Sequence, residues 1–254
     1  MQSTGSDWIH YLANPHRFMR LAAVVTWPLW GVALALMIWG LILGFAAPPD
    51  YQQGETVRIM FVHVPAAWMS LFAYTFIFVA SVVALVFRHP LGHVAARAAA
   101  PVGAVFALTT LVTGALWGQP MWGTWWVWDA RLTSVLVLFL IYLGYIAIWR
   151  AIDAPDVAAR AASVLAIVGF INVPIVKFSV DWWNTLHQPA SVSRFARPAL
   201  HSDFLIPLLV MGVAFMVLFC ALVFTRMQSE IWAQRSRRVD EETGAPAHQG
   251  RSNG

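Results

Sequence analysis

The sequence predicts an all-α, polytopic integral membrane protein with six transmembrane helices. Hydrophobic residues make up 59% of the 254-residue chain and charged residues only 11%, whereas a soluble domain carries about 25% charged residues. Six apolar stretches approach or exceed the roughly 20 residues that a helix needs to cross the hydrocarbon layer. So few charges exclude both a water-soluble globule and a chain that is disordered throughout.

The six predicted spans are connected by short polar segments. They cover residues 24–46, 59–87, 95–116, 132–149, 158–178 and 204–224. No apolar stretch with a small-residue cleavage site lies in the first twenty residues, so we expect the first span to be an uncleaved anchor. We expect residues 1–238 to form one membrane domain. Residues 239–254 are acidic and polar, and this predicts a disordered cytoplasmic tail.

Arginine and lysine placement predicts the orientation, because connections rich in these residues stay in the cytoplasm. Eleven of the 16 lie in the two terminal segments and in the connections after the second and fourth spans. Both termini are therefore predicted to be cytoplasmic. Since the positive charge is explained by topology, nucleic acid is not expected as a partner.

Two residue counts exclude specific chemistries. The single cysteine, Cys220, excludes an intrachain disulfide and a CxxCH haem-attachment motif. The single lysine, Lys177, does not follow a Gly-rich run, so the chain has no Walker A loop. Any ATPase that works with this protein must be another chain.

The second outward connection, residues 117–131, carries five tryptophans within twelve residues. One interpretation is an aromatic belt, because indoles favour the membrane–water boundary. The other is an apolar platform for a flat ligand, in which Trp122, Trp125 and Trp126 share one face of a short surface helix. Trp128 belongs to the same cluster, and Gly123 would allow close backbone approach.

Asp129 closes this tryptophan cluster and has two interpretations. It is suitably placed to be the N-cap of the fourth span. Alternatively, its carboxylate orients an indole N–H or Arg131. Residue type and position favour the cap.

Two outward histidines flank the tryptophan segment. His63 begins the second span, and its helical neighbours Ala66, Ala67 and Ser70 are all small. This pattern fits close helix packing with the imidazole bonded across the interface, and it also leaves room for a flat group beneath the ring. His187 lies in the third outward connection, residues 179–203, beside another tryptophan pair.

Imidazoles from two segments could ligate one haem iron from its two faces. The macrocycle would then lie against the indoles. A zinc site fits less well, because the outward segments contain no cysteine and no HxxH pair. The candidates for contacts with the haem propionates are the outward arginines Arg58, Arg131, Arg194 and Arg197.

The run Trp122-Gly123-Thr124-Trp125-Trp126-Val127-Trp128-Asp129 resembles the tryptophan-rich "WWD" signature of the haem-handling membrane proteins of cytochrome c maturation. Within that superfamily, six spans with both ends inside resemble the haem exporter protein C (CcmC) family. The resemblance covers the chain up to about residue 239.

The resemblance implies a function that the residues alone do not give. Its members present haem b, bound transiently, at the periplasmic face of the bacterial inner membrane and deliver it to the haem chaperone CcmE. They work with the ABC transporter subunits CcmA and CcmB and with CcmD. The family's two iron ligands correspond to His63 and His187, and its signature to residues 122–129.

The resemblance describes a carrier, which is not an enzyme and is at most haem lyase-like toward the chaperone. Two other classes stay open from the residues. One is a secondary transporter for a small amphipathic solute, which would hold its substrate near the midplane in broken helices. The other is a structural scaffold subunit of an ABC-type complex.

Overall fold

The computed structural model describes residues 14–187 and 200–243, which contain helices and no β-strand. The helices in chain order are α2 (Pro15–Ala46), η1 (Glu55–Ile59), α3 (Met60–Val86), α4 (Pro90–Trp122), α5 (Ala130–Ala151), α6 (Pro155–Gly169), α7 (Asn172–Trp182) and α8 (Ser202–Thr243). Six segments are long and apolar enough to cross a membrane, with η1 continuing into α3 and α6 paired with α7. The predicted all-α, six-span fold class is confirmed.

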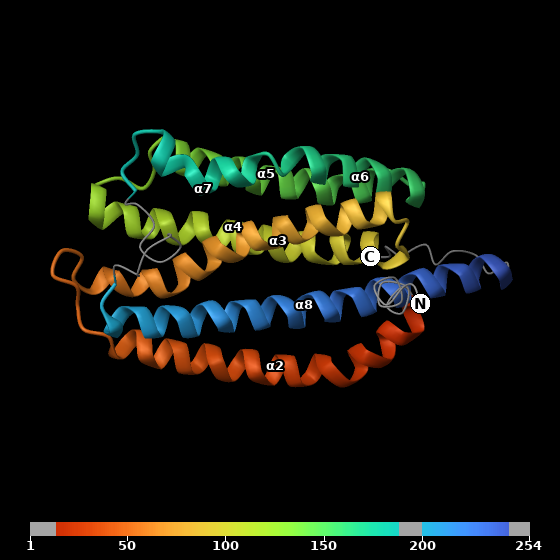
Figure 1. The fold of residues 1–254 in the computed structure, drawn as a ribbon, viewed down its shortest axis with the longest axis horizontal. Coiled ribbons are helices and arrows are strands. Elements are labelled where there is room, and N and C mark those ends of the chain that lie inside the picture. The colour runs from red at the N-terminus through yellow and green to blue at the C-terminus, as the bar shows by residue number, and fades with distance from the viewer. Residues whose placement is uncertain (1–13, 188–199, 244–254) are drawn as a thin grey trace, which may run out of the picture.

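The helices lie roughly parallel in three groups (Figure 1). α2 packs along α8, and α3 packs along α4, while α5, α6 and α7 form the remaining group. α2 begins and α8 ends at the same end of the bundle, as the predicted orientation requires. The end that holds the connection between α4 and α5 is called the outer end below, and the opposite end the inner end.

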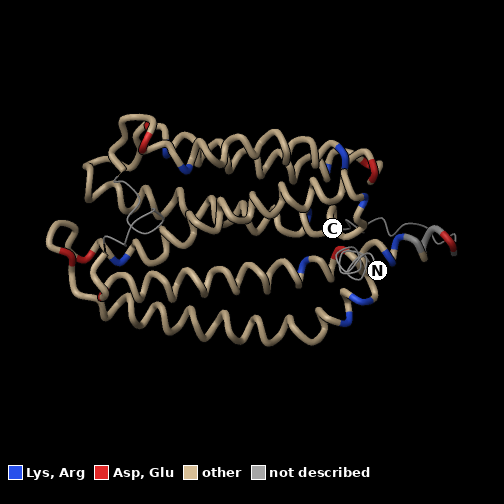
Figure 2. The backbone as a smooth tube through the Cα atoms, in the orientation of Figure 1, with Lys and Arg blue, Asp and Glu red and all other residues tan. Residues whose placement is uncertain are grey.

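Lysine and arginine gather at the two ends of the bundle and are more frequent at the inner end (Figure 2). One of these inner arginines, Arg97, forms an ion pair with Glu230 at 3.4 Å and stacks over the Trp149 ring at 4.7 Å. Arg226 on α8 donates from Nε to the Ala98 carbonyl at 3.0 Å. Both arginines therefore tie α4 to its neighbours at the membrane boundary.

Several helices are longer than the predicted spans. α4 has 33 residues, which at 1.5 Å per residue gives about 50 Å, more than the roughly 30 Å of hydrocarbon. Part of α4 therefore extends beyond the hydrocarbon layer. The connection predicted over 117–131 is reduced to 123–129, and the one predicted over 179–203 lies between α7 and α8.

α8 continues to Thr243, into the segment that was predicted as a disordered tail. The disordered tail remains a prediction. The rest of the predicted tail, residues 244–254, lies outside the described residues.

The fifth span is broken at residues 170–171, although the sequence predicted it as continuous. The turn separates α6 from α7, and Phe170 stacks on Phe78 with ring centroids 4.1 Å apart. The buried Asn172 amide donates to the Ser134 carbonyl at 2.9 Å and so fastens the start of α7 to α5. Local packing and this bond stabilise the break.

Small residues allow α4 to approach its neighbours closely. Tyr142 of α5 is fully buried and donates from its hydroxyl to the Ser70 carbonyl of α3 at 2.7 Å. The backbone of Gly103 lies directly against the Tyr142 ring, so a Cβ there would overlap it. Such contacts between small residues and large rings are the usual means of packing membrane helices.

The Gly103→Ala variant is expected to be less stable than the wild type by about 1–3 kcal/mol, because the added methyl displaces a ring held in place by a hydrogen bond. Gly31 is the matched control, since a Cβ there meets nothing within 4 Å. Gly31→Ala is expected to be neutral or stabilising by about 0.5–1 kcal/mol. Thermal unfolding of the purified variants in detergent measures both. Equal stabilities for the two variants would contradict the packing assignment.

Candidate functional site

The tryptophan connection begins where Gly123 ends α4. Gly123 has φ +76°, in the left-handed region that glycine adopts without strain, and its N–H donates to the Gln119 carbonyl at 2.9 Å. The predicted surface helix across Trp122, Trp125 and Trp126 is therefore wrong. Trp122 is the last residue of α4, and residues 124–129 are not helical.

The indoles of this connection fall into different environments. Trp125 is 58% exposed and Trp128 is 77% exposed. The Trp126 ring packs edge-on against Trp128 with centroids 5.4 Å apart, and its Nε1–H is buried without a hydrogen-bond partner. The Thr124 hydroxyl bonds the backbone of Trp126 and shapes the turn. The connection thus presents two exposed tryptophans, while the unsatisfied donor of Trp126 is buried.

Asp129 caps α5 and also reaches the next outward segment. Its Oδ1 accepts from the Leu132 N–H at 2.8 Å, so the N-cap interpretation is confirmed. Its Oδ2 accepts from the Thr185 hydroxyl and lies 3.2 Å from Nδ1 of His187. The orienting role also exists, but its target is His187, whereas the sequence suggested an indole or Arg131.

His187 is fixed on three sides. Its backbone N–H donates to the Thr185 hydroxyl at 3.1 Å, its Nδ1 faces Asp129, and its ring meets Trp122 edge-on with centroids 4.9 Å apart. Burial lowers the pKa of His187 below its ordinary value, although the Asp129 carboxylate opposes that shift. The neutral imidazole is therefore the favoured form.

The Asp129 carboxylate stays ionised at this position. Burial raises its pKa, but hydrogen bonds from Thr185 and from the Leu132 N–H, together with His187, outweigh burial and bring the pKa below its ordinary value. An ionised carboxylate accepts the proton on Nδ1 of His187. The lone pair of that ring then lies on Nε2.

His63 lies near the start of α3 and bonds across to α4. Its Nδ1 is 3.0 Å from the Thr113 hydroxyl, as the packing interpretation expected. That hydroxyl donates to the Thr109 carbonyl at 2.6 Å, so it accepts from Nδ1–H of His63. The ring also lies edge-on to Trp117, with centroids 5.6 Å apart, and against Gly114. His63 therefore also carries its lone pair on Nε2.

The two imidazoles approach the same helix end. His63 packs against Trp117 and His187 packs against Trp122, one and a half turns farther along α4. No described side chain bonds Nε2 of either ring. Within residues 14–187 and 200–243 no group of three or more His, Cys, Asp or Glu could hold a metal ion.

The structure describes two of the four arginines that were predicted to contact the haem propionates. Arg131 donates from Nε to the Ser179 hydroxyl at 3.1 Å and so links α5 to α7. Arg58 pairs with Glu55 at 2.6 Å, while its Nε is buried without a partner. Arg194 and Arg197 lie outside the described residues.

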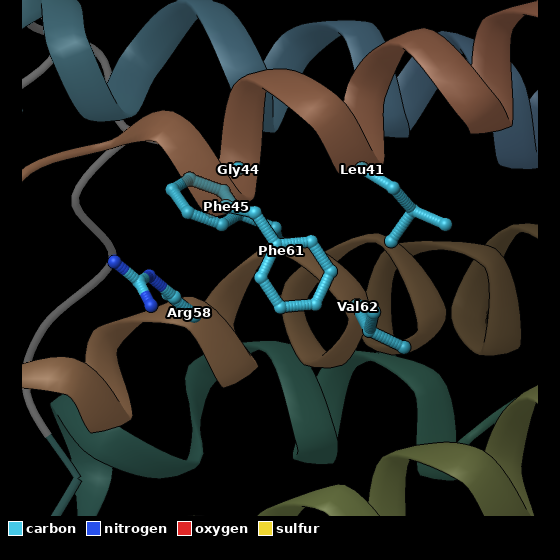
Figure 3. A pocket seen from close by; sticks show the side chains of 6 residues that line it. All are labelled: Leu41, Gly44, Phe45, Arg58, Phe61 and Val62. Carbon is cyan, nitrogen blue, oxygen red and sulfur yellow. The ribbon is translucent and has the colours of Figure 1, made fainter.

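Arg58 also lines a small cavity of about 70 Å³ between α2 and α3 (Figure 3). The other side chains around it are apolar, including Phe45 and Phe61. This cavity is too small for a macrocycle. A ligand at the indoles would therefore meet Arg58 only from the outer surface.

Sequence reasoning missed the residues that hold the imidazoles. The Thr113 hydroxyl bonds Nδ1 of His63, and the Thr185 hydroxyl bonds the backbone N–H of His187. Gln53 accepts from the indole N–H of Trp117, the ring that packs against His63, at 3.1 Å. Thr185 had a local signal, since a threonine two residues before a histidine can form a hydroxyl–backbone turn. No local sequence pattern indicated the roles of Thr113 and Gln53.

Fold and site together define a six-span membrane protein that presents an indole-rich connection and two positioned imidazoles at one end. The sequence model of the family described as heme exporter protein C matches residues 8–242. This chain belongs to the haem exporter protein C family.

Individual members of that family are similar over nearly their whole length. Heme exporter protein C of Bradyrhizobium diazoefficiens is 58% identical over 228 residues, which cover 90% of this chain and 87% of the relative. That of Paracoccus denitrificans is 47% identical over 225 residues, covering 88% and 93%. That of Escherichia coli K12 is 43% identical over 233 residues, covering 91% and 93%.

Proposed function

We propose that this protein binds haem at its outer end and delivers it to the haem chaperone CcmE during maturation of c-type cytochromes. His63 and His187 ligate the iron through Nε2, one from each face. The tryptophan connection carries the macrocycle. The family name supports haem export, and the arrangement of the imidazoles supports the ligand assignment.

One observation carries the proposal: both imidazoles are held by Nδ1, and Nε2 has no described hydrogen-bond partner on either ring. Metal-ligating histidines usually donate the other ring N–H to a carboxylate, a carbonyl or another acceptor. If the two histidines served only in helix packing, there would be no reason for Nε2 of both rings to lack a hydrogen-bond partner. The neutral form favoured for His187 suits ligation as well.

The indoles supply the second requirement, an apolar surface for the ring. The exposed faces of Trp125 and Trp128 offer large contact area with little conformational entropy to lose. The exposed side of the Arg58 guanidinium is suited to a propionate.

The proposal includes a location and partners. The site faces the periplasm from the bacterial inner membrane, and haem b is bound transiently as cargo. CcmA and CcmB supply the ATPase that this chain lacks, and CcmD completes the complex. The chain itself is a carrier with no enzyme chemistry of its own beyond any part in joining haem to the chaperone.

A visible spectrum of the purified full-length protein tests the function. We expect haem bands typical of two imidazole ligands. After the haem-free chaperone is added and the two proteins are separated, we expect this protein to have lost its haem bands and the chaperone to have gained haem absorption. A colourless protein that assembles normally with its partners and fails to take up added haem would instead favour the scaffold class. The spectrum therefore separates carrier from scaffold in one measurement.

The transporter class is favoured by one observation, the break between α6 and α7. The polar side chain at this break, Asn172, is already bonded to the Ser134 carbonyl. No Asp, Glu, Lys or Arg lies between residues 161 and 176. The break therefore has no free polar group for a solute, and the carrier function is the better supported.

A further inference from the structure

A second cavity lies at the inner end, away from the indoles and histidines described above. The end of α3 and the beginnings of α4 and α6 line this open cavity, which has a volume of about 380 Å³. Its polar lining comes from Arg88, His89, His93, Asp156 and Arg160. The haem carrier function uses none of these residues.

The charges around this cavity are not balanced. Arg88 and Arg160 form no ion pair among the described residues, in contrast to Arg97, which pairs with Glu230 at 3.4 Å. Asp156 supplies the only acidic side chain in the lining. Two arginines against one carboxylate leave an excess of positive charge.

Two helix starts add to the positive potential. α4 begins at Pro90 and α6 at Pro155, and neither has a side-chain hydrogen bond at its N-cap. The first residue of each helix is a proline without an N–H, and the N–H groups of Gly92 and Val157 already donate to the His89 and Ala154 carbonyls, each at 3.1 Å. The contribution of the two helix starts is therefore the positive end of each helix dipole, which favours an anion nearby.

Arg88 ends α3 and also lines the cavity. Arg88 has φ +50°, and it is the one non-glycine residue with a positive φ among those the structure describes. Arg88 follows Phe87, the C-cap residue of α3, and a residue in the left-handed conformation commonly ends a helix at this position. Glycine adopts this conformation with less strain than arginine does.

The surroundings indicate a ligand that is anionic at one end and apolar at the other. Phe87, which precedes Arg88, is 64% exposed, and Val157, which follows Asp156, is 47% exposed. Both lie where α3 ends and α6 begins, at the membrane boundary. Basic pockets between transmembrane helices on this side are known to bind anionic head groups.

We propose that this inner cavity binds the phosphate of an anionic phospholipid, with Arg88 and Arg160 as its charged contacts and Phe87 and Val157 against its acyl chain. The lipid would fasten the second, third and fifth spans together at the inner end.

The test measures phospholipid binding to the full-length protein. Phosphatidylglycerol is titrated into nanodiscs of phosphatidylcholine, thermal unfolding is followed, and native mass spectrometry counts the lipid that is retained. We expect Arg88→Gln and Arg160→Gln each to weaken phosphatidylglycerol binding about fivefold, and the double variant about 25-fold.

Two further variants separate binding from folding. Arg88→Gly removes the side chain and relieves the backbone, so we expect it to lose lipid binding while keeping wild-type thermal stability in phosphatidylcholine alone. Arg150→Gln removes an exposed arginine at the same end that does not line the cavity. It is expected to retain wild-type binding.

Three outcomes would overturn the proposal. If Arg150→Gln lost phosphatidylglycerol binding to the same extent, the effect would come from the general surface charge and not from the cavity. Wild-type binding in the Arg88/Arg160 double variant would exclude the cavity. If inorganic phosphate stabilised the protein as much as phosphatidylglycerol does, the ligand would be a free anion and the lipid assignment would be wrong.

Discussion

The variants His63→Gly and His187→Gly are each expected to lose most of the haem that co-purifies with the wild-type chain. Loss of only the hydrogen-bond partner of a metal-ligating histidine typically lowers metal affinity about 10- to 100-fold. Loss of the ligand itself is therefore expected to cost at least about 100-fold. Haem content per protein, measured from the visible spectrum after purification from membranes, gives the result.

Soluble imidazole distinguishes ligation from structural damage. The glycine variants leave empty the space that the histidine ring occupies in the wild type. Added imidazole can enter this space and is expected to restore the haem bands in both variants. It cannot repair a misfolded helix pair. Restoration would support the axial assignment, while a variant that stays haem-free with imidazole and also unfolds earlier would mark its histidine as structural.

His201 is the matched control for both variants. It lies at the same end, just before α8, and its imidazole is 72% exposed and pairs with Asp203 at 3.4 Å. His201→Gly is expected to keep wild-type haem content. Normal haem in the His63 and His187 variants as well would remove the axial roles and the main support for the site.

Hydropathy predicted the six spans because the bilayer sets a single length scale for every crossing helix. It could not predict where the helices end, since α4 continues to Trp122 and α8 to Thr243 through residues that no longer need lipid. Helix ends are decided by local bonds. Gly123 stops α4 through a left-handed conformation, which helical spacing across the tryptophans could not show.

The partners of Asp129 show the limit of local reasoning more clearly. Its cap on α5 lies three residues away in sequence and was predicted. Thr185 and His187 lie 56 and 58 residues away, and they reach Asp129 only because α7 packs along α5. Residue types predicted the two histidines as candidates, but only the fold shows which side chains hold each ring.

The two rings are held differently, and this difference predicts the order of ligand release. Nδ1 of His187 faces the ionised Asp129 carboxylate at 3.2 Å, whereas Nδ1 of His63 faces the Thr113 hydroxyl at 3.0 Å. A carboxylate makes the imidazole a stronger donor to iron than a hydroxyl does. We expect His187 to hold the iron more firmly and His63 to be the ligand that an incoming group replaces first.

Asp129→Asn is therefore expected to weaken haem binding about 10- to 100-fold and to raise the reduction potential of the bound haem, because a weaker donor stabilises ferric iron less. Asparagine caps a helix as well as aspartate does, so α5 should keep its N-terminus. Thr113→Val removes the weaker partner and is expected to shift the potential less. Haem titration and spectroelectrochemistry of both variants provide the comparison. Equal shifts in the two would mean that the rings are equivalent and that release has no preferred first step.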